Sequence, residues 1–498
     1  MKALLDTNII IHREATTVIS QDIGILYHWL DKGHYIKCVH SASINEIKKN
    51  TNESIVRSLL IKLQSYETIQ IPSPLHKDVR IVSDNNDINE NDLVDSTLLN
   101  EVYVGRVDLL VSEDKKIHKK AQELGISSKV YTISSFLENV FADHPDLVDY
   151  KVLSVKKVKF GDLKLEDPFF DSLKEDYKGF EQWFIRKYDE DAYITFNSEN
   201  GSLLSFLYLK IEDYTEDYSD ISPRFTPKKR LKIGTFKVIS NGFRLGERFL
   251  KIIFDNALNN KVDEIYLTVF KNRPEQLMLI SLVEKWGFSY WGTKGTESIY
   301  VRDFSPMIKG NMRESYPYVS ASKNIYLVPI YPEYHTELLP DSILNNESPR
   351  DFIESFPHRN GIEKVYVSRA YDRPAVGDIL VFYRTGGYYK SVVTTLGQVL
   401  EVRSDFKNEE DFVNYCKKAT VFPKDELIRQ WCLRNNKPFV VRFLYIYSFP
   451  KRLNMKELID LGVLSNKDDA PRGFRKIRKI DLKNILTNSH SDESFIIY

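Results

Sequence analysis

The chain begins with the stretch Ala3-Leu4-Leu5-Asp6-Thr7-Asn8, an apolar strand that ends in an acid. A second apolar run, residues 107–111, is followed by Ser112-Glu113-Asp114. In an open parallel sheet, ligands lie at the carboxyl ends of the strands. We therefore expect Asp6 and Asp114 at the same edge of one sheet.

Short apolar strands alternate with helical patterns over residues 1–140, which predicts a doubly wound α/β domain. The predicted strands are residues 2–5, 35–39, 107–111 and 130–132.

Two further acids, Glu46 and Asp95, lie between the strand ends that carry Asp6 and Asp114. Four clustered carboxylates repel one another unless a cation neutralises them, and Mg²⁺ or Mn²⁺ prefers oxygen ligands. The expected chemistry is metal-assisted cleavage of a phosphodiester.

Each acid also has a structural explanation. Glu46 follows Ser43 at capping-box spacing, which on its own favours a helix cap, and Asp92 is placed to be an N-cap. Asp114 could cap the helix that follows it. Asp95 lies among apolar helix positions, where an unpaired acid is unfavourable, so a structural role explains it less well.

Taken together, the Leu-Leu-Asp-Thr-Asn stretch, the early Glu46, the helical Asp95 and the Leu-Val-Ser-Glu-Asp stretch nineteen residues later resemble the PIN-domain ribonucleases over residues 1–135. The resemblance implies a Rossmann-like domain at residues 1–140. Its catalytic and metal-binding acids would be Asp6, Glu46, Asp95 and Asp114, oriented by Asn8 and Ser112. Whether Asp92 or Asp95 is the third acid stays open; the family spacing favours Asp95.

A different fold is expected in the middle of the chain. Predicted strands (192–196, 203–210, 231–239 and 264–269) surround an amphipathic helix over residues 247–258. The stretch Asn241-Gly242-Phe243-Arg244-Leu245-Gly246 before that helix resembles the pyrophosphate loop of GNAT acetyltransferases, in which backbone N–H groups at a helix N-terminus hold phosphate.

The resemblance covers residues 165–305 and implies an α+β GNAT-like domain at 150–305 with acetyl-CoA as a candidate cofactor. The cofactor-binding residues would be Asn241, Gly242, Arg244, Gly246 and Glu247. Arg244 stands where the family usually has glycine, and Val283 where many members have a tyrosine general acid. Tyr290 or a water chain could substitute, and the alternative is a degenerate scaffold.

Residues 315–322 are rich in Ser, Tyr and Pro, which predicts a linker. The β-rich segment after it contains a Gly-Asp pair, Gly377-Asp378, followed by apolar strands at 379–383 and 397–402. This pattern resembles the PUA-like superfamily, nearest its ASCH and EVE members. It implies a β-barrel at residues 323–498 that binds RNA.

Basic residues are dense near the end of the chain, next to Phe474. Such a run favours phosphate contacts, although it can also be a solvated face. The candidate RNA-binding residues are Arg384, Arg472, Arg475, Lys476, Arg478 and Lys479. Tyr383, Tyr388 and Tyr389, with Arg384 and Lys390, form an aromatic and basic strip suited to stacking on single strands.

The length, composition and cysteine content limit the number of domains and the class of protein. The chain has 498 residues, 42% of them hydrophobic, which predicts about three domains. Lys+Arg and Asp+Glu each total 70, so the net charge does not by itself indicate a nucleic-acid-binding protein. No apolar run reaches the ~18 residues that span a membrane. Three widely spaced cysteines (Cys38, Cys416 and Cys432) predict reduced thiols and a cytoplasmic location.

Two hypotheses of function follow. The first is a metal-dependent endoribonuclease with an acetyltransferase-like domain and an RNA-recognition module that binds tRNA or another structured RNA. By analogy of fold it would be a bacterial toxin or phage-defence component with a small DNA-binding antitoxin as partner. The alternative is an acetyl-CoA-dependent N-acetyltransferase acting on an RNA-linked or protein substrate, with the other domains as recognition modules. A non-enzymatic RNA-binding scaffold is disfavoured by the four acids.

Overall fold

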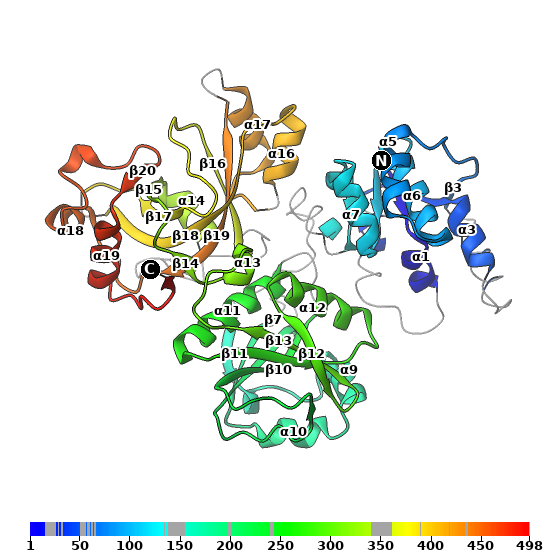
Figure 1. The fold of residues 1–498 in the computed structure, drawn as a ribbon, viewed down its shortest axis with the longest axis horizontal. Coiled ribbons are helices and arrows are strands. Elements are labelled where there is room, and N and C mark those ends of the chain that lie inside the picture. Colours follow the sequence, from blue (N-terminus) through cyan, green and yellow to red (C-terminus); the bar gives the residue numbers. More distant parts are fainter. Residues whose placement is uncertain are drawn as a thin grey trace. The chain divides into compact units, whose positions relative to one another are not determined.

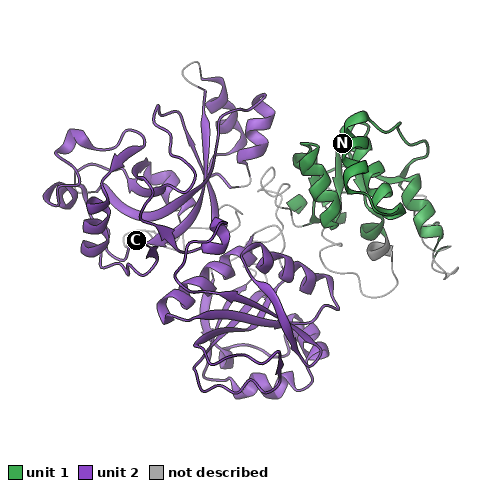
Figure 2. Cartoon of the chain, viewed as in Figure 1, with its two compact units in different colours: residues 1–144 green, residues 145–498 purple. Residues whose placement is uncertain are grey.

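The computed structural model forms two compact units, unit 1 with residues 1–144 and unit 2 with residues 145–498 (Figure 2). The residues that it describes are 1–14, 26–27, 29–30, 33–49, 56, 60, 63, 66–133, 135–137, 155–196, 201–239, 244–339, 361–388, 390–417, 419–433 and 437–497. The prediction of a multidomain α/β protein is confirmed by four sheets among the described residues, one in unit 1 and three in unit 2, one of which has only two strands.

Unit 1 is built on a five-stranded sheet of order β3-β2-β1-β4-β5, in which every pairing is parallel. The strands are β1 (Lys2–Leu5), β2 (Ile36–His40), β3 (Glu67–Ile69), β4 (Leu109–Val111) and β5 (Val130–Tyr131). Parallel sheets need helical crossovers, and the described helices are α1 (Thr7–Glu14), α3 (Ser41–Lys48), α5 (Lys77–Asn86), α6 (Glu90–Tyr103) and α7 (Lys115–Glu123) (Figure 1).

The register of this sheet brings the ends of β1 and β4 together. Leu5 is level with Val111, and the N–H of Asp6 donates to the carbonyl of Val111. Buried apolar side chains fill the contact between strands and helices, among them Leu4, Leu99, Leu110 and Ile117. Asp6 and Ser112 therefore lie side by side at the carboxyl edge.

The first sheet of unit 2 has eight strands in the order β6-β7-β8-β10-β11-β13-β12-β9. They are β6 (Lys156–Lys159), β7 (Asp191–Phe196), β8 (Leu203–Glu212), β9 (Ile221–Ser222), β10 (Arg230–Val238), β11 (Glu264–Val269), β12 (Ser289–Lys294) and β13 (Glu297–Asp303). The helices of this part are α9 (Asp171–Asp176), α10 (Phe180–Arg186), α11 (Leu245–Asn260) and α12 (Pro274–Lys285).

One pair in this sheet is parallel, β10 with β11. Its register runs from Arg230↔Glu264 to Ile233↔Leu267 and then stops, although β10 continues to Val238. The two strands therefore part at their carboxyl ends.

The second sheet of unit 2 has the order β16-β19-β18-β17-β15-β20. Its strands are β15 (Ile325–Ile330), β16 (Glu363–Ser368), β17 (Ile379–Arg384), β18 (Val392–Arg403), β19 (Phe439–Ser448) and β20 (Arg475–Ile477). The helices around it are α14 (Pro332–Leu338), α16 (Glu409–Cys416), α17 (Lys424–Cys432), α18 (Met455–Asp460) and α19 (Lys479–Asn488). The predicted strands are present, but within the described residues the outer strands β16 and β20 do not pair, so a closed barrel is not seen.

The predicted linker at residues 315–322 is wrong, because this segment is part of the core of unit 2. Tyr316 is fully buried, and its ring meets Trp286 and Phe254. After α13 (Met312–Ser315), strand β14 (Val319–Ser320) pairs with β21 (Ile496–Ile497). Serine, tyrosine and proline suggested exposure, but aromatic packing reverses that expectation.

Among the described residues, no helix is long and apolar enough to cross a bilayer.

His335 makes the stability of unit 2 sensitive to acid. Its side chain is buried on α14, with Nε2 2.9 Å from Thr394 Oγ1. Burial lowers the pKa of His335 to about 3, and the nearby cations Arg384 and Arg452 add to this. In the unfolded chain His335 binds a proton below pH ~6.5, whereas in the folded chain it stays neutral. The free energy of unfolding therefore falls as the pH drops below this value.

We expect His335→Gln to recover about 2 kcal/mol of the stability that the wild type loses between pH 7 and pH 5. Thermal unfolding of unit 2 at both pH values measures this difference. His490→Gln is the control, since His490 is exposed. Equal acid sensitivity in all three proteins would contradict the assignment to His335.

Candidate functional site

Asp6 is the most buried acid of the predicted metal site, with 4% of its surface exposed. Ser112 Oγ donates a hydrogen bond of 2.8 Å to Asp6 Oδ2, the contact expected of a group that orients a ligand. Burial raises the pKa of Asp6 to about 6; the bond from Ser112 opposes this, and the carboxylates of Asp114 and Glu46 add to it.

Asp95 lies half-buried on α6 and feels the same acids. Burial raises the pKa of Asp95 to about 7, with repulsion from Asp114 and Asp6 in support and the cation of Lys120 in opposition. The four predicted acids thus share one electrostatic environment at the carboxyl edge of the sheet.

Asp92 also raises the pKa of Asp95, but unlike Asp95 it pairs with a cation within the described part of the chain. Its Oδ1 is 2.6 Å from Lys116 Nζ, and its Oδ2 accepts from the N–H of Ile88. The hydrogen bond from Lys116 holds the pKa of Asp92 below its ordinary value. The N-cap of α6 is Asn89, so the prediction of Asp92 as N-cap is wrong by three residues. Of the two candidates for the third acid, Asp95 is the one without such a partner among the described residues.

Helix positions explain the other two acids in part. Asp114 is the N-cap of α7 and accepts from the N–H of Lys116 at 2.6 Å, as its structural explanation predicted. The capping-box interpretation of Glu46 is wrong, because α3 begins at Ser41 with His40 as its N-cap, which places Ser43 and Glu46 inside the helix. Glu46 is half-buried there.

A metal site is not formed in the described part of the chain. No group of three or more His, Cys, Asp or Glu side chains there has the spacing to hold a metal ion. The chemistry of the donors nevertheless fits a hard divalent cation, because all four predicted ligands are carboxylates and two carry a raised pKa that a cation would relieve. Asn8, expected to assist them, is exposed on α1.

At the second predicted site, the start of α11, Asn241 and Gly242 lie outside the described residues. Arg244 adopts a left-handed backbone with φ 56°, and its Nη2 is 2.6 Å from Glu247 Oε2. A Cβ on Gly246 would lie 2.7 Å from Leu282. Val283 is fully buried, and Tyr290 is exposed on β12 with Lys271 Nζ 5.0 Å from its ring centre. The described polar groups of the loop thus contact protein partners.

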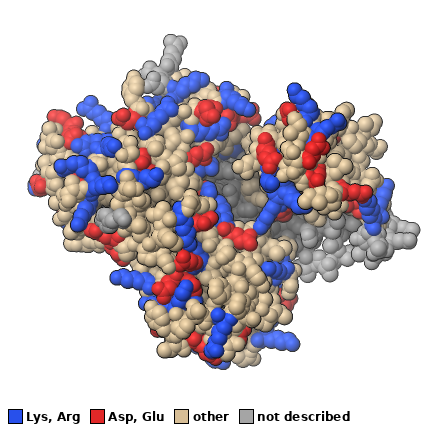
Figure 3. Space-filling view, in the orientation of Figure 1, with Lys and Arg blue, Asp and Glu red and all other residues tan. Residues whose placement is uncertain are grey.

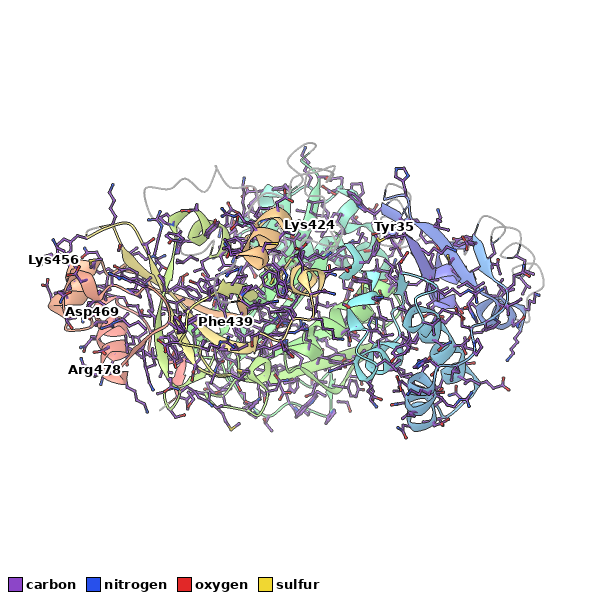
Figure 4. All side chains as sticks on the ribbon, turned by 90° about the horizontal axis from the view of Figure 1, so that it is seen from above. Tyr35, Lys424, Phe439, Lys456, Asp469 and Arg478 are labelled. Atoms are coloured by element: carbon purple, nitrogen blue, oxygen red, sulfur yellow. The ribbon has the colours of Figure 1, made fainter. Side chains whose placement is uncertain are left out.

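The basic segment at residues 472–479 is partly neutralised. Arg475 forms two hydrogen bonds with Asp469, of 2.6 and 3.0 Å, and Arg478 forms several with Asp481, the shortest 2.6 Å. Figure 4 shows Asp469 and Arg478 in the orange-to-red part of the ribbon that carries these pairs. In Figure 3, cations and acids are interspersed over the visible face.

Three of the predicted RNA-binding residues remain exposed without an ion pair among the described residues: Arg472, Lys476 and Lys479. Arg384 lies at the end of β17, half-buried, while Tyr383 beside it is 1% exposed and cannot stack on a base. Tyr388 is covered by Lys467, whose Nζ is 4.4 Å from the ring centre, and Tyr389 lies outside the described residues.

Sequence reasoning missed the partners of these side chains. Glu363, Arg313 and Lys285 meet around α11, although they lie far apart in the sequence. Lys120, buried between α6 and α7, was also missed; its Nζ is 2.5 Å from Asp87 Oδ1. Only Asp481 carried a local signal, since it follows Arg478 at capping-box spacing.

No protein-family model matches the chain, and no curated protein matches it. Among solved structures, it is similar to an ASCH protein from Zymomonas mobilis, at 10% identity over 33% of this chain and 94% of that one, with a TM-score of 0.25. It is also similar to a GNAT-family acetyltransferase from Listeria monocytogenes, at 17% identity over 26% of this chain and 71% of that one, with a TM-score of 0.19.

A third similarity is to human THYN1, solved with DNA containing 5-methylcytosine, at 13% identity over 34% of this chain and 99% of that one, with a TM-score of 0.21. At these identities and TM-scores, the similarities say nothing about the activity of this chain.

Neutralising Asp95 should stabilise metal-free unit 1 at pH 8. An acid whose folded pKa is raised to about 7 destabilises the folded chain progressively as pH rises above its ordinary pKa near 4. We expect Asp95→Asn to raise the Tm of unit 1 by about 2–5 °C at pH 8 and to have little effect at pH 4. Asp92→Asn, on the same helix, should lower the Tm at pH 8, because it breaks the pair with Lys116. Destabilisation by both changes at pH 8 would contradict the raised pKa of Asp95.

The free and paired cations of the basic segment should differ in RNA binding. Changing Arg472, Lys476 and Lys479 together to alanine should reduce the salt slope of binding to single-stranded RNA by about 2, since each lost phosphate contact removes roughly 0.7. Changing Arg475 and Arg478 should alter the slope less, because their charge is already neutralised. Fluorescence anisotropy across a salt series measures both slopes, and an unchanged slope in the triple variant identifies a solvated face.

Proposed function

We propose that unit 1 is a metal-dependent ribonuclease in which Asp6, Asp95 and Asp114 bind Mg²⁺ or Mn²⁺, with Glu46 at the rim. The observation that carries this proposal is the raised pKa of two acids at the carboxyl edge of a parallel sheet, each raised in part by the same carboxylate, Asp114. A purely structural domain gains nothing from such repulsion, whereas a divalent cation removes it.

In this proposal the side chains of the chain prepare the site. Ser112 fixes one oxygen of Asp6, and a backbone hydrogen bond at Thr7 also favours the charged carboxylate. The bond from Lys116 engages one oxygen of Asp92, whose charge nevertheless contributes to the repulsion at Asp95. A divalent cation, when bound, would polarise the phosphate and stabilise the leaving oxygen.

RNA would be held by the cations of unit 2. Arg472, Lys476 and Lys479 are exposed near β20 and the start of α19, where phosphate groups can reach them. Their contribution is sequence-independent, because phosphate contacts position a nucleic acid without reading its bases. The module would thus raise the local concentration of RNA for the nuclease.

A second candidate function is acetyl transfer by the first sheet of unit 2. The parting of β10 and β11 after Ile233↔Leu267 favours it, since an opening between parallel strands at their carboxyl ends exposes backbone groups to a ligand. The charged contacts at the start of α11 oppose it, so we rank it below the nuclease.

The nuclease proposal is tested with single variants of the full chain. Asp6→Asn should reduce Mn²⁺-dependent cleavage of RNA below detection, and Ser112→Ala should reduce it about 10- to 100-fold, because it frees the orientation of Asp6. Asp84→Asn, an exposed acid on α5, is the control. Cleavage is measured with a fluorescently labelled RNA, with and without EDTA. Equal rates for Asp6→Asn and the wild type would refute the proposal.

A further inference from the structure

Five charged side chains meet where α11 begins, and we call them the α11 cluster: Arg244, Glu247, Lys285, Arg313 and Glu363. Glu363 Oε1 lies 3.1 Å from Lys285 Nζ and 2.7 Å from Arg313 Nε. Glu247, the third residue of α11, pairs with Arg244. Three cations therefore surround two carboxylates.

The two carboxylates come from different sheets of unit 2. Glu247 lies on the helix that packs on the first sheet, and Glu363 begins β16 of the second. Backbone contacts join them as well: the N–H of Ile362 donates to Glu247 Oε2 at 3.0 Å, and Arg244 Nη1 donates to the carbonyl of Glu363 at 3.2 Å.

The fit around Arg244 leaves no space for a side chain at residue 361. A Cβ on Gly361 would collide with the guanidinium, which is already held by Glu247 and by the carbonyl of Glu363. The side chain of Arg244 is only 8% exposed. The end of the helix is thus closed by residues 361–363.

Apolar packing continues the contact beyond the charges. Phe249 and Ile253 of α11 belong to the same buried cluster as Leu444 of β19 and Ile362, which directly precedes β16. Lys251 Nζ lies 5.2 Å from the ring centre of Tyr445. The α11 cluster is therefore the charged border of one continuous core.

Both carboxylates are held in their charged form. Burial opposes ionisation of Glu363, but Lys285 and Arg313 hold its pKa below the ordinary value. Burial likewise opposes ionisation of Glu247, and Arg244 and Lys285 hold its pKa below the ordinary value. The N-terminus of α11, which favours an anion, already has a carboxylate in its first turn.

We propose that the N-terminus of α11 is closed by the chain's own carboxylates and serves as a structural joint between the two sheets of unit 2. It does not take a phosphate-bearing ligand such as CoA. The observations at this joint do not fit the cofactor that the loop sequence suggested. The proposal is independent of the nuclease of unit 1 and stands against the second candidate function.

The joint is tested by calorimetric unfolding of the full chain. Glu363→Gln should lower the unfolding transition of unit 2 by at least about 5 °C or divide it in two, because the partly buried Arg313 and the half-exposed Lys285 lose their buried partner. Glu401→Gln is the control: Glu401 is half-exposed on the same sheet and lies 3.8 Å from Arg442. A transition shifted no more than that of the control would overturn the joint. If Glu363→Gln does not fold, Lys285→Met, which removes the same pair from a half-exposed position, should give a smaller fall of the same kind.

The closure is tested by titrating the wild-type chain with acetyl-CoA up to millimolar concentration. We expect no saturable heat, and the same result for Arg244→Ala. Saturable binding that Arg244→Ala weakens tenfold or more would overturn the proposal, since Arg244 would then serve a ligand. Saturable binding that is insensitive to Arg244→Ala would overturn the closure as well, since backbone N–H groups at a helix N-terminus can hold phosphate without the guanidinium.

Discussion

A buried guanidinium holds unit 2 together where its two sheets meet. Arg302, on β13, is 1% exposed, and its Nη2 donates to the carbonyls of Arg313, Glu314 and Tyr316 at the end of α13. The ring of Phe254 lies 4.2 Å from the guanidinium carbon. Burial lowers the pKa of Arg302 to about 9, which still leaves it charged at neutral pH. Among the described residues Nη2 has hydrogen-bond partners, whereas Nε and Nη1 are buried without one. The bonds from Nη2 join β13 to the residues that lead into the second sheet, because a buried cation is costly unless its donors find acceptors.

The two units differ in how the charge of their buried acids is compensated. In unit 2, cations of the chain itself surround Glu363 and Glu247, so no bound ligand is needed to compensate their negative charge. In unit 1, the buried Asp6 and the half-buried Asp95 lie near other acids, and the cation of Lys120 offsets only part of the repulsion at Asp95. The neighbouring Asp87 shows that unit 1 can neutralise an acid, since it pairs with the buried Lys120. The contrast indicates that the acids of the sheet edge are left uncompensated for a ligand.

The strands were predictable from sequence because apolar runs of four to ten residues are local signals. β1 and β11 match their predicted residues, and most other predicted strands begin or end within a few residues of the observed ones. The candidate acids could also be placed, since the end of an apolar strand fixes the edge of a parallel sheet. What sequence could not give was the partner of each charge. Arg475 was expected to contact RNA, yet the tertiary fold pairs it with Asp469. Glu363 drew no prediction from the sequence, and the fold pairs it with Arg313. The linker prediction at Tyr316 failed for the same reason, because composition does not show which aromatic rings will pack against one another.

The pairing of β14 with β21 joins residues 319–320, which precede the second sheet in the sequence, to residues 496–497, which follow it. Phe495, next to β21, is fully buried in the core that also contains Phe254 of α11. During synthesis, the first sheet of unit 2 is translated long before β21. The contact between the two sheets is therefore incomplete until residues 495–497 have been synthesised.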